Sequence, residues 1–309
     1  MIITVTLTPA LDKTVILPDF RVDQVNRIQS VRLDPGGKGI NVSKGLRVLG
    51  TDSIATGILG GDTGLYIERS LHRLGIACDF IWTDSETRTN LKIVDPLRHT
   101  NTDINEAGAP VSKATLEDVF RKIETASKAG DIAVFAGKAP AGTDDGIFAD
   151  WTERLRRHGV QVYLDADSEL LIRGAKAHPA LIKPNGAELS RLVGRSFSGV
   201  EEMADAARKL AADGIGTVVV SLGSDGALFV TRDTALRAEG LKVEVNSTVG
   251  AGDSMLAAMA CGNERGMSFR DTCALATAFS AAAVTTAGTQ PAEMEVVRDL
   301  LQRVCITEI

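Results

Sequence analysis

An aspartate lies inside a glycine-rich turn, TVGAGDSM at residues 248–255, and its charge is unexpected there. The turn leads from an alternating stretch, LKVEVN, into a helical pattern, SMLAAMACG. Backbone N–H groups at the start of a helix, preceded by glycines that let the chain turn tightly, form a site suited to anions such as phosphate. The carboxylate of Asp253 would repel such an anion, so the turn combines an anion site with an acid.

A second glycine turn, PGGKGINV at residues 35–42, precedes the first long helical pattern. Its backbone at Gly36 and Gly37 would approach a polyhydroxylated ligand closely, and Lys38 and Asn41 would donate hydrogen bonds to the ligand oxygens. Asp12 ends the first predicted strand and could accept hydrogen bonds from two sugar hydroxyls. Each residue is equally consistent with an ordinary turn before a helix.

Arg88 and Asn90 are two residues apart in ETRTNLKI, so they share one face if this segment is a strand. An arginine fork donates two parallel hydrogen bonds, which suits phosphate. The alternative is an edge arginine in water. Arg27, nearer the N-terminus, is a second candidate for the same anion.

The sequence KPNGAEL at residues 183–189 opens a helical pattern and has two interpretations. Asn185 and Glu188 have the spacing of a capping box, which needs no ligand. Alternatively they would hold Mg²⁺ through water, while Lys183 lies near a nucleotide phosphate. The later turn SLGSDGAL is either a simple hairpin or a source of nucleotide contacts. Its candidate contacts are Ser221, Gly223 and Gly226.

The elements that must position these residues alternate between strand and helix. MIITVTL precedes GINVSKGLRVLG, DIAVFAG precedes DWTERLRRHG, and QVYLDAD precedes SELLIRGA. This alternation predicts an α/β fold with a mainly parallel sheet. Segments at about 13–34 and 88–105 alternate with period two and have no intervening helix. We expect them to form a small β-sheet lid over the carboxyl ends of the main strands.

Composition excludes several classes of protein. The formal net charge of −6 argues against a nucleic-acid surface. No apolar run reaches the roughly 18 residues of a membrane span, and the first twenty residues lack a secretion signal, so we expect a cytoplasmic protein. The longest run, at residues 275–288, predicts a buried helix. The four cysteines lack CxxC spacing and are expected to be reduced.

Two common nucleotide-binding signatures are absent. A P-loop requires GxxxxGK[ST], and DPGGKGIN at residues 34–41 lacks both the spacing and the following hydroxyl residue. A dinucleotide fingerprint requires GxGxxG after the first strand, but Gly250 and Gly252 are followed by Met255 where the third glycine should stand.

The ordered set PGGKGINV, TRTN, KPNGAE, SLGSDGA and TVGAGDS, spread from residue 35 to 254, resembles the PfkB/ribokinase-like carbohydrate kinases. The opening TVTLTPALD, the lid segments NRIQ and TDIN, and VGAGDSM are most similar to the 1-phosphofructokinases, with tagatose-6-phosphate kinases close behind. The resemblance spans residues 1–309. It implies one ribokinase-like domain with three layers, in the order α/β/α, and a small lid that is often a dimer contact.

The resemblance also implies ATP-dependent phosphorylation of a phosphorylated ketohexose, with Mg²⁺, in a homodimer joined through the lid. Asp253 matches the general base, and a helix N-terminus should lower its pKa and keep it ionised. The anion hole matches Gly250, Ala251 and Gly252, with the amide of Asp253. Sugar-phosphate positions match Asp12, Gly37, Lys38, Asn41, Arg88 and Asn90. Nucleotide and magnesium positions match Lys183, Asn185, Glu188, Ser221, Gly223 and Gly226.

Three departures from the family pattern stand near the implied site. Lys138 replaces a serine in the turn at residues 137–140, where it would contact a phosphate or point into solvent. Thr8 replaces an asparagine in the opening motif. The sequence DADSE at residues 165–169 lacks the common DxSG form.

Several alternatives stay open at this point. Fructose 1-phosphate is the first choice of substrate, and tagatose 6-phosphate and fructose 6-phosphate are the alternatives. A non-catalytic sensor would usually have lost the base or the magnesium glutamate, and both Asp253 and Glu188 are present. A nicotinamide-dependent oxidoreductase is disfavoured by the missing fingerprint.

Overall fold

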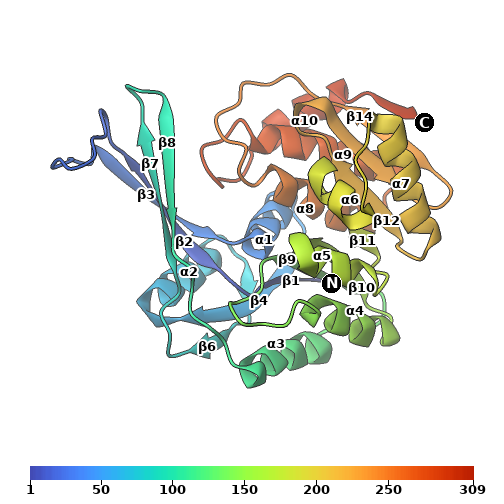
Figure 1. Cartoon of the computed structure of the whole chain (residues 1–309), viewed down its shortest axis with the longest axis horizontal. Coiled ribbons are helices and arrows are strands. Elements are labelled where there is room, and N and C mark those ends of the chain that lie inside the picture. Colours follow the sequence, from blue (N-terminus) through green and yellow to red (C-terminus); the bar gives the residue numbers. More distant parts are fainter.

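Alternating strands and helices build the main sheet of the computed structural model, which describes residues 1–309 (Figure 1). Eight strands run parallel, and the last three are antiparallel, so the prediction of a mainly parallel sheet is confirmed. In spatial order the strands are β15 (Ile306–Glu308), β14 (Ala235–Glu239), β13 (Gly226–Val230), β12 (Thr217–Ser221), β11 (Leu181–Ile182), β10 (Gln161–Ala166), β9 (Ile132–Gly137), β1 (Ile2–Thr6), β4 (Ser53–Gly60) and β5 (Ala77–Cys78), with β6 (Ile81–Thr83) also paired to β4.

Helices cover both faces of this sheet and complete the predicted three layers. One layer holds α1 (Lys38–Val48), α2 (Gly61–Arg73), α8 (Ala251–Glu264), α9 (Phe269–Ala283) and α10 (Met294–Arg303). The other holds α3 (Lys113–Ala126), α4 (Ile147–Arg157), α5 (Ser168–Ala175), α6 (Gly186–Val193) and α7 (Val200–Ala212). Neighbouring strand residues face opposite layers: Ile2 packs in one core and Ile3 in the other. The central strands therefore read as continuous apolar runs.

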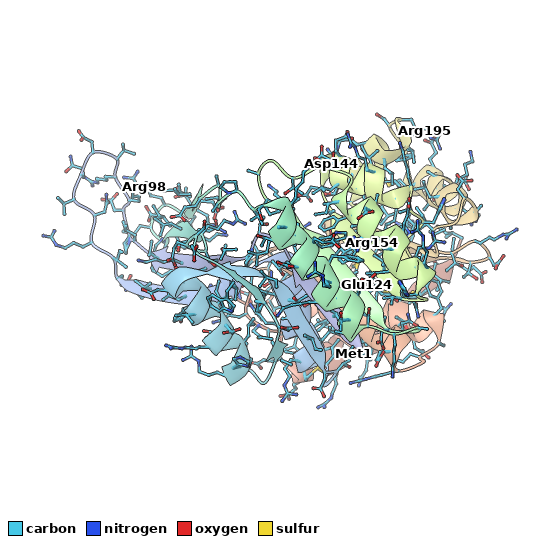
Figure 2. All side chains as sticks on the ribbon, turned by 90° about the horizontal axis from the view of Figure 1, so that it is seen from below. Met1, Arg98, Glu124, Asp144, Arg154 and Arg195 are labelled. Carbon is cyan, nitrogen blue, oxygen red and sulfur yellow. The ribbon has the colours of Figure 1, made fainter.

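A separate four-stranded sheet projects from one side of the body and forms the predicted lid (Figure 1). Its order is β3 (Ser30–Gly36), β2 (Ala10–Ile16), β7 (Thr89–Asp95) and β8 (Thr100–Asn105). Arg98 lies near the far end of this lid, where its guanidinium pairs with Asp19 at 2.6 Å (Figure 2). Asp95 accepts backbone hydrogen bonds from both loops at this end, including those of Phe20 and Arg98. The two lid hairpins are thus tied together at their tips.

The lid has two chemically different faces. Side chains paired across its strands point the same way, and alternate residues point oppositely. Polar residues of one face line a cleft, and they are Asp12, Thr14, Asp34, Asn90, Lys92, Asp103 and Asn105. Val31, Leu33 and Ile104 stand at the alternate positions of β3 and β8 and are exposed on the opposite face. The sheet therefore presents a polar surface to the cleft and an apolar surface away from it.

One boundary differs from the sequence prediction. The first strand ends at Thr6, and Asp12 lies inside the lid strand β2 rather than at the end of β1. Pro9 has no N–H group and cannot continue the β1 ladder, so the chain leaves the main sheet before Ala10. The lid accordingly begins three residues earlier than predicted.

Three further predictions concern the longest apolar run, the cysteines and membrane spans. The apolar run at residues 275–288 is a buried helix up to Ala283 and continues as turns. All four cysteines are free thiols, and Cys261 and Cys273 are buried. None of the helices has the length and apolar character needed to span a membrane.

Candidate active site

A cleft of about 550 Å³ lies between the polar face of the lid and the carboxyl ends of β1, β9 and β10. Ligands of open α/β sheets bind at this end of the strands. The cleft brings together ten of the residues singled out in the sequence: Asp12, Gly37, Lys38, Asn41, Arg88, Asn90, Lys183, Gly250, Gly252 and Asp253.

Asp253 is buried at the first turn of α8, directly beneath the cleft. Gly250 has φ 85°, the left-handed conformation that glycine adopts without strain, and α8 begins at Ala251. The Asp253 carboxylate is only 6% exposed and accepts a hydrogen bond of 2.8 Å from the amide Nδ2 of Asn41. The predicted turn, with its amides at a helix start and its acid beside them, is present.

Burial raises the pKa of Asp253 to about 6, and the nearby carboxylate of Asp165 adds to this effect. The Asn41 hydrogen bond and the cations Lys38 and Lys183 act in the opposite direction but do not prevail. The expectation that the helix N-terminus would lower this pKa is therefore wrong, because loss of hydration outweighs the helix dipole. Asp253 remains mostly ionised at neutral pH and is a stronger base than an exposed aspartate.

Two lysines flank a buried carboxylate beside the glycine turn. Asp165, at the end of β10, lies 3.2 Å from Nζ of Lys38 and 3.1 Å from Nζ of Lys183. Burial alone would raise the pKa of Asp165, but these two cations hold it below its usual range. A side chain at Gly252 would place its Cβ 2.9 Å from Nζ of Lys183. The glycine therefore leaves room for Lys183 beside the backbone amides at the start of α8.

Polar groups on the lid side of the cleft are held in place yet keep bonding capacity. Asn90 donates to Asp12 at 2.9 Å, and its own Oδ1 is buried without a partner. Arg88 donates to the carbonyl oxygens of Glu106 and Thr8, while its Nε is buried without an acceptor. Buried polar atoms normally have partners, so a bound polar ligand would complete this set.

Cations are numerous in the cleft, and not all of them are paired with carboxylates. Lys92 pairs with Asp103 at 3.5 Å, and Lys38 and Lys183 pair with Asp165. Lys138 lines the cleft and forms no ion pair. Its carbonyl oxygen accepts a hydrogen bond of 3.3 Å from the hydroxyl of Thr8, which joins two of the departures from the family pattern.

The remaining predicted residues lie outside this cleft. Asn185 and Glu188 form a complete capping box at the start of α6, with bonds of 2.8 and 2.9 Å. A bridge pairs Asn185 with Ser221, so the two candidate nucleotide segments lie side by side. Gly223 and Gly226 have φ values of 63° and 98° in the turn of the β12–β13 hairpin, as the hairpin interpretation predicts.

Arg27 and Ser168 were also singled out in the sequence, and neither lines the cleft. Arg27 is exposed in the loop between β2 and β3 and does not line the cleft of its own chain. Ser168, in the segment that lacks the DxSG form, has φ 50°, a conformation that favours glycine.

Some cleft residues were missed from the sequence. Lys92 is two residues after Asn90, and Asp103 and Asn105 alternate in the same way in β8, so the period-two pattern contained a signal for them. Asp165 stood at the end of a predicted strand. Its pairing with two distant lysines depends on the tertiary fold and had no local signal.

Comparison with known proteins agrees with this geometry. The family model "pfkB family carbohydrate kinase" matches residues 5–295. The 1-phosphofructokinase of Haemophilus influenzae is 37% identical over 100% of this chain and 98% of its own length. That of Escherichia coli K12 is 36% identical over 91% of this chain and 90% of its own. Phosphofructokinase-2 from Escherichia coli, solved in complex with substrates and products, superposes with a TM-score of 0.92 at 28% identity, covering 98% of both chains.

Proposed function

Because the chain belongs to the pfkB family of carbohydrate kinases, we propose that it transfers the γ-phosphoryl group of ATP to O6 of fructose 1-phosphate. The chain is a sugar-phosphate kinase of the phosphofructokinase type. This membership rules out the nicotinamide-dependent oxidoreductase considered above. One observation carries the assignment of roles: a buried base at a glycine turn shares a cleft with several cations.

The proposed chemistry is an in-line displacement at the γ-phosphorus. A bond forms between O6 and phosphorus, the bond to the β,γ-bridging oxygen breaks, and ADP leaves. Asp253 accepts the hydroxyl proton, and its pKa of about 6 suits a base that works near neutral pH. The amides of residues 250–253 stabilise charge on the transferring group. Phosphoryl transfer depends mostly on positioning and charge stabilisation, so a weak base is sufficient.

The paired lysines explain how an acid can lie beside an anion site. Lys38 and Lys183 stand next to the turn and are fixed by Asp165. They place positive charge near the transferring phosphoryl group and offset the negative charge of Asp253. Asn41, a candidate sugar contact, donates a hydrogen bond to Asp253, so we place the Asp253 carboxylate on the sugar side of the cleft.

Magnesium would be held through water by Glu188 and Asn185. The capping box engages one carboxylate oxygen, Oε2 of Glu188, and leaves its Oε1 available. A water-bridged contact with retained hydration suits Mg²⁺. When bound, the ion supplies positive charge to the nucleotide phosphates. The adjacent hairpin would contact the nucleotide through the hydroxyl of Ser221 and the backbone at Gly223 and Gly226.

The phosphate already present on the sugar would be read by Arg88 and Lys138. Arg88 has an unpartnered buried Nε, and Lys138 has no carboxylate partner. Asp12 and Asn90 then bind sugar hydroxyls between this phosphate and Asp253.

We also propose that two copies associate through the outer face of the lid. Val31 and Ile104 are about half exposed there, although they alternate with cleft residues in regular strands. An apolar face on a projecting sheet is the expected signature of an interface. In such a dimer, Arg27 would lie at the edge of the contact.

A coupled ADP-release assay tests the function. Fructose 1-phosphate, tagatose 6-phosphate and fructose 6-phosphate are compared by kcat/KM in the presence of ATP and Mg²⁺. We expect fructose 1-phosphate to rank first. A tenfold advantage for tagatose 6-phosphate or fructose 6-phosphate would replace it as the substrate. Absence of ADP release with all three would favour the sensor alternative.

A further inference from the structure

A lysine is buried directly behind the cleft and belongs to none of the roles assigned so far. Lys44 lies on α1, is 5% exposed, and does not line the cleft. Its Nζ donates to three acceptors: the carbonyl of Pro35 at 3.2 Å, Oδ1 of Asn41 at 3.3 Å and the hydroxyl of Thr289 at 3.3 Å. These acceptors come from the C-terminal end of the lid strand β3, from α1, and from the loop after α9.

The contact with Asn41 fixes which way that side-chain amide faces. An ammonium group can only donate hydrogen bonds, so it must meet the amide oxygen. The ionised carboxylate of Asp253 can only accept, so it must meet the amide NH₂ group, as observed at 2.8 Å. A flipped amide would place its oxygen against the carboxylate and its NH₂ group against the ammonium. Lys44 and Asp253 therefore select the same orientation from opposite sides.

We propose that Lys44 is a positioning residue that holds the Asn41 amide with its NH₂ group toward Asp253. This inference rests on the proposed role of Asp253 as the base. Hydrogen bonds to Pro35 and Thr289 hold the ammonium group of Lys44 in place, so the Asn41 amide contacts a fixed group rather than a mobile side chain.

Several charged groups surround Lys44, Asn41 and Asp253. Lys44 is near Asp34 and Arg32 of β3, Asp12 of β2, and Asp253. Burial lowers the pKa of Lys44 to about 8, although the three carboxylates oppose the effect, so the ammonium form prevails at pH 7. Asp253 additionally faces the ionised side chains of Asp165, Lys38 and Lys183. None of these three contacts Lys44.

The substitution Lys44→Met removes the donor and keeps an unbranched side chain. We expect kcat to fall about tenfold because the base is disturbed, with a smaller rise in KM for the sugar phosphate because Asn41 is also a candidate substrate contact. The acid limb of the kcat profile should move to higher pH, since Asp253 loses a well-oriented donor. Arg47→Met is the matched control: Arg47 is an exposed cation of the same helix, bonded to Leu74 and Asp52 and not to Asn41.

A double-mutant cycle separates positioning from simple charge. In the Asn41→Ala background, Lys44→Met should change kcat little further. An equal effect in both backgrounds would mean that Lys44 acts on Asp253 by charge alone, and it would overturn the proposal. Unchanged kcat and pH profile in the single Lys44→Met variant would also overturn it.

A readout without substrate keeps this inference separate from the proposed function. The pKa of Asp253 can be measured by NMR titration of ¹³C-labelled aspartate, with the Asp253 signal assigned by its loss in Asp253→Asn. Lys44→Met should raise this pKa when Asn41 is present. The rise should be smaller in the Asn41→Ala background. An inactive wild-type protein would refute the function, while this titration would still decide the role of Lys44. If Lys44→Met does not fold, Thr289→Val removes one anchor instead. It should shift the Asp253 titration in the same direction by a smaller amount, and no shift would overturn the proposal.

Discussion

At the scale of single residues, burial decides the chemistry of the site. Asp253 sits at a helix start, where the dipole should favour its ionised form, yet loss of hydration and the nearby Asp165 raise its pKa to about 6. The motifs in the sequence identified Asp253, Lys38 and Asn41 because glycine turns mark them locally. The sequence did not indicate the roles of Lys44 and Asp165, because these depend on partners more than 100 positions away in the chain. Lys38 is such a partner of Asp165, and Thr289 is such a partner of Lys44.

The substitution Asp253→Asn tests the base directly. We expect kcat to fall by roughly 10² to 10⁴ because proton transfer is lost while the fold and the anion-hole amides remain. In the wild-type enzyme, kcat should decline as the pH falls through about 6, where Asp253 takes up a proton. Steady-state kinetics from pH 5 to 8, with sugar-phosphate binding measured by calorimetry, check both points. Near-normal turnover by the variant would remove Asp253 from the mechanism.

The same substitution should make the folded protein more stable at neutral pH. The pKa of Asp253 is about 6 in the folded state against an ordinary value of 3.8, so between these values the folded state keeps a proton that the unfolded chain releases. Stability from this group is therefore present at low pH, is lost as the pH rises from about 4 to 6, and stays lost above that. Asp253→Asn should gain on the order of 3 kcal/mol in unfolding free energy at pH 8.

Urea unfolding at several pH values checks this prediction. The difference between variant and wild type should shrink toward zero near pH 4. A variant that is less stable than wild type at pH 8 would contradict the raised pKa. Asp145→Asn is a suitable control, because Asp145 is an exposed carboxylate outside the cleft.

At the scale of elements, α1 is the helix that delivers most of the site. Lys38, Asn41 and Lys44 follow one another at a spacing of three and lie on one side of the helix. The start of α1 has no capping side chain of its own, and the hydroxyl of Thr6 accepts from the N–H of Ile40 instead. The sequence predicted this helix and the strand before it. It did not predict this cap, because the cap comes from a residue of β1.

Alternation along the chain predicted the main sheet and the lid well, but it did not predict every segment. LKVEVN alternates like a strand and forms none. An alternating pattern is compatible with a strand but does not ensure a neighbouring strand with which to pair. The strand boundary at Pro9 was missed because the apolar run continues across it, although the proline itself was a signal.

Close packing of α1 on β1 makes Gly39 sensitive to substitution. A Cβ at Gly39 would lie 2.5 Å from both Oγ1 of Thr6 and the carbonyl oxygen of Val5. Gly39→Ala should therefore displace the helix, destabilise the protein by about 1–3 kcal/mol and lower kcat by displacing Asn41. Thermal unfolding and kinetics check this. Gly199→Ala, which meets only the end of the flexible Glu201 side chain, should have little effect on kcat.

At the scale of the whole molecule, the lid separates two functions onto two faces of one sheet. Its polar face completes the cleft, and its apolar face carries the proposed contact with a second copy. Only one layer of β-sheet therefore separates the proposed substrate site from the proposed subunit interface. The period-two pattern predicted the lid, and the family resemblance implied the dimer contact, whereas the assignment of side chains to faces required the strand register.

Charges on the outer face should disrupt the dimer. Val31 and Ile104 are 51% and 53% exposed, and the double variant Val31→Asp, Ile104→Asp should be monomeric by light scattering when the wild type is dimeric. Leu301→Asp is the control, because Leu301 is an exposed leucine of α10, away from the lid. A wild-type protein that is monomeric at micromolar concentration would contradict the proposed contact.

The single-layer lid also determines which evolutionary changes it can accept. Because its side chains alternate between the two faces, replacing one residue in β2 or β7 alters only one face. Deleting or inserting one residue would exchange the faces of everything beyond it, turning apolar side chains into the cleft and charged ones outward. Related chains should therefore vary in residue type along these strands outside cleft residues such as Asp12 and Asn90, while keeping the strand lengths constant. Insertions should collect in the loops at residues 17–29 and 96–99.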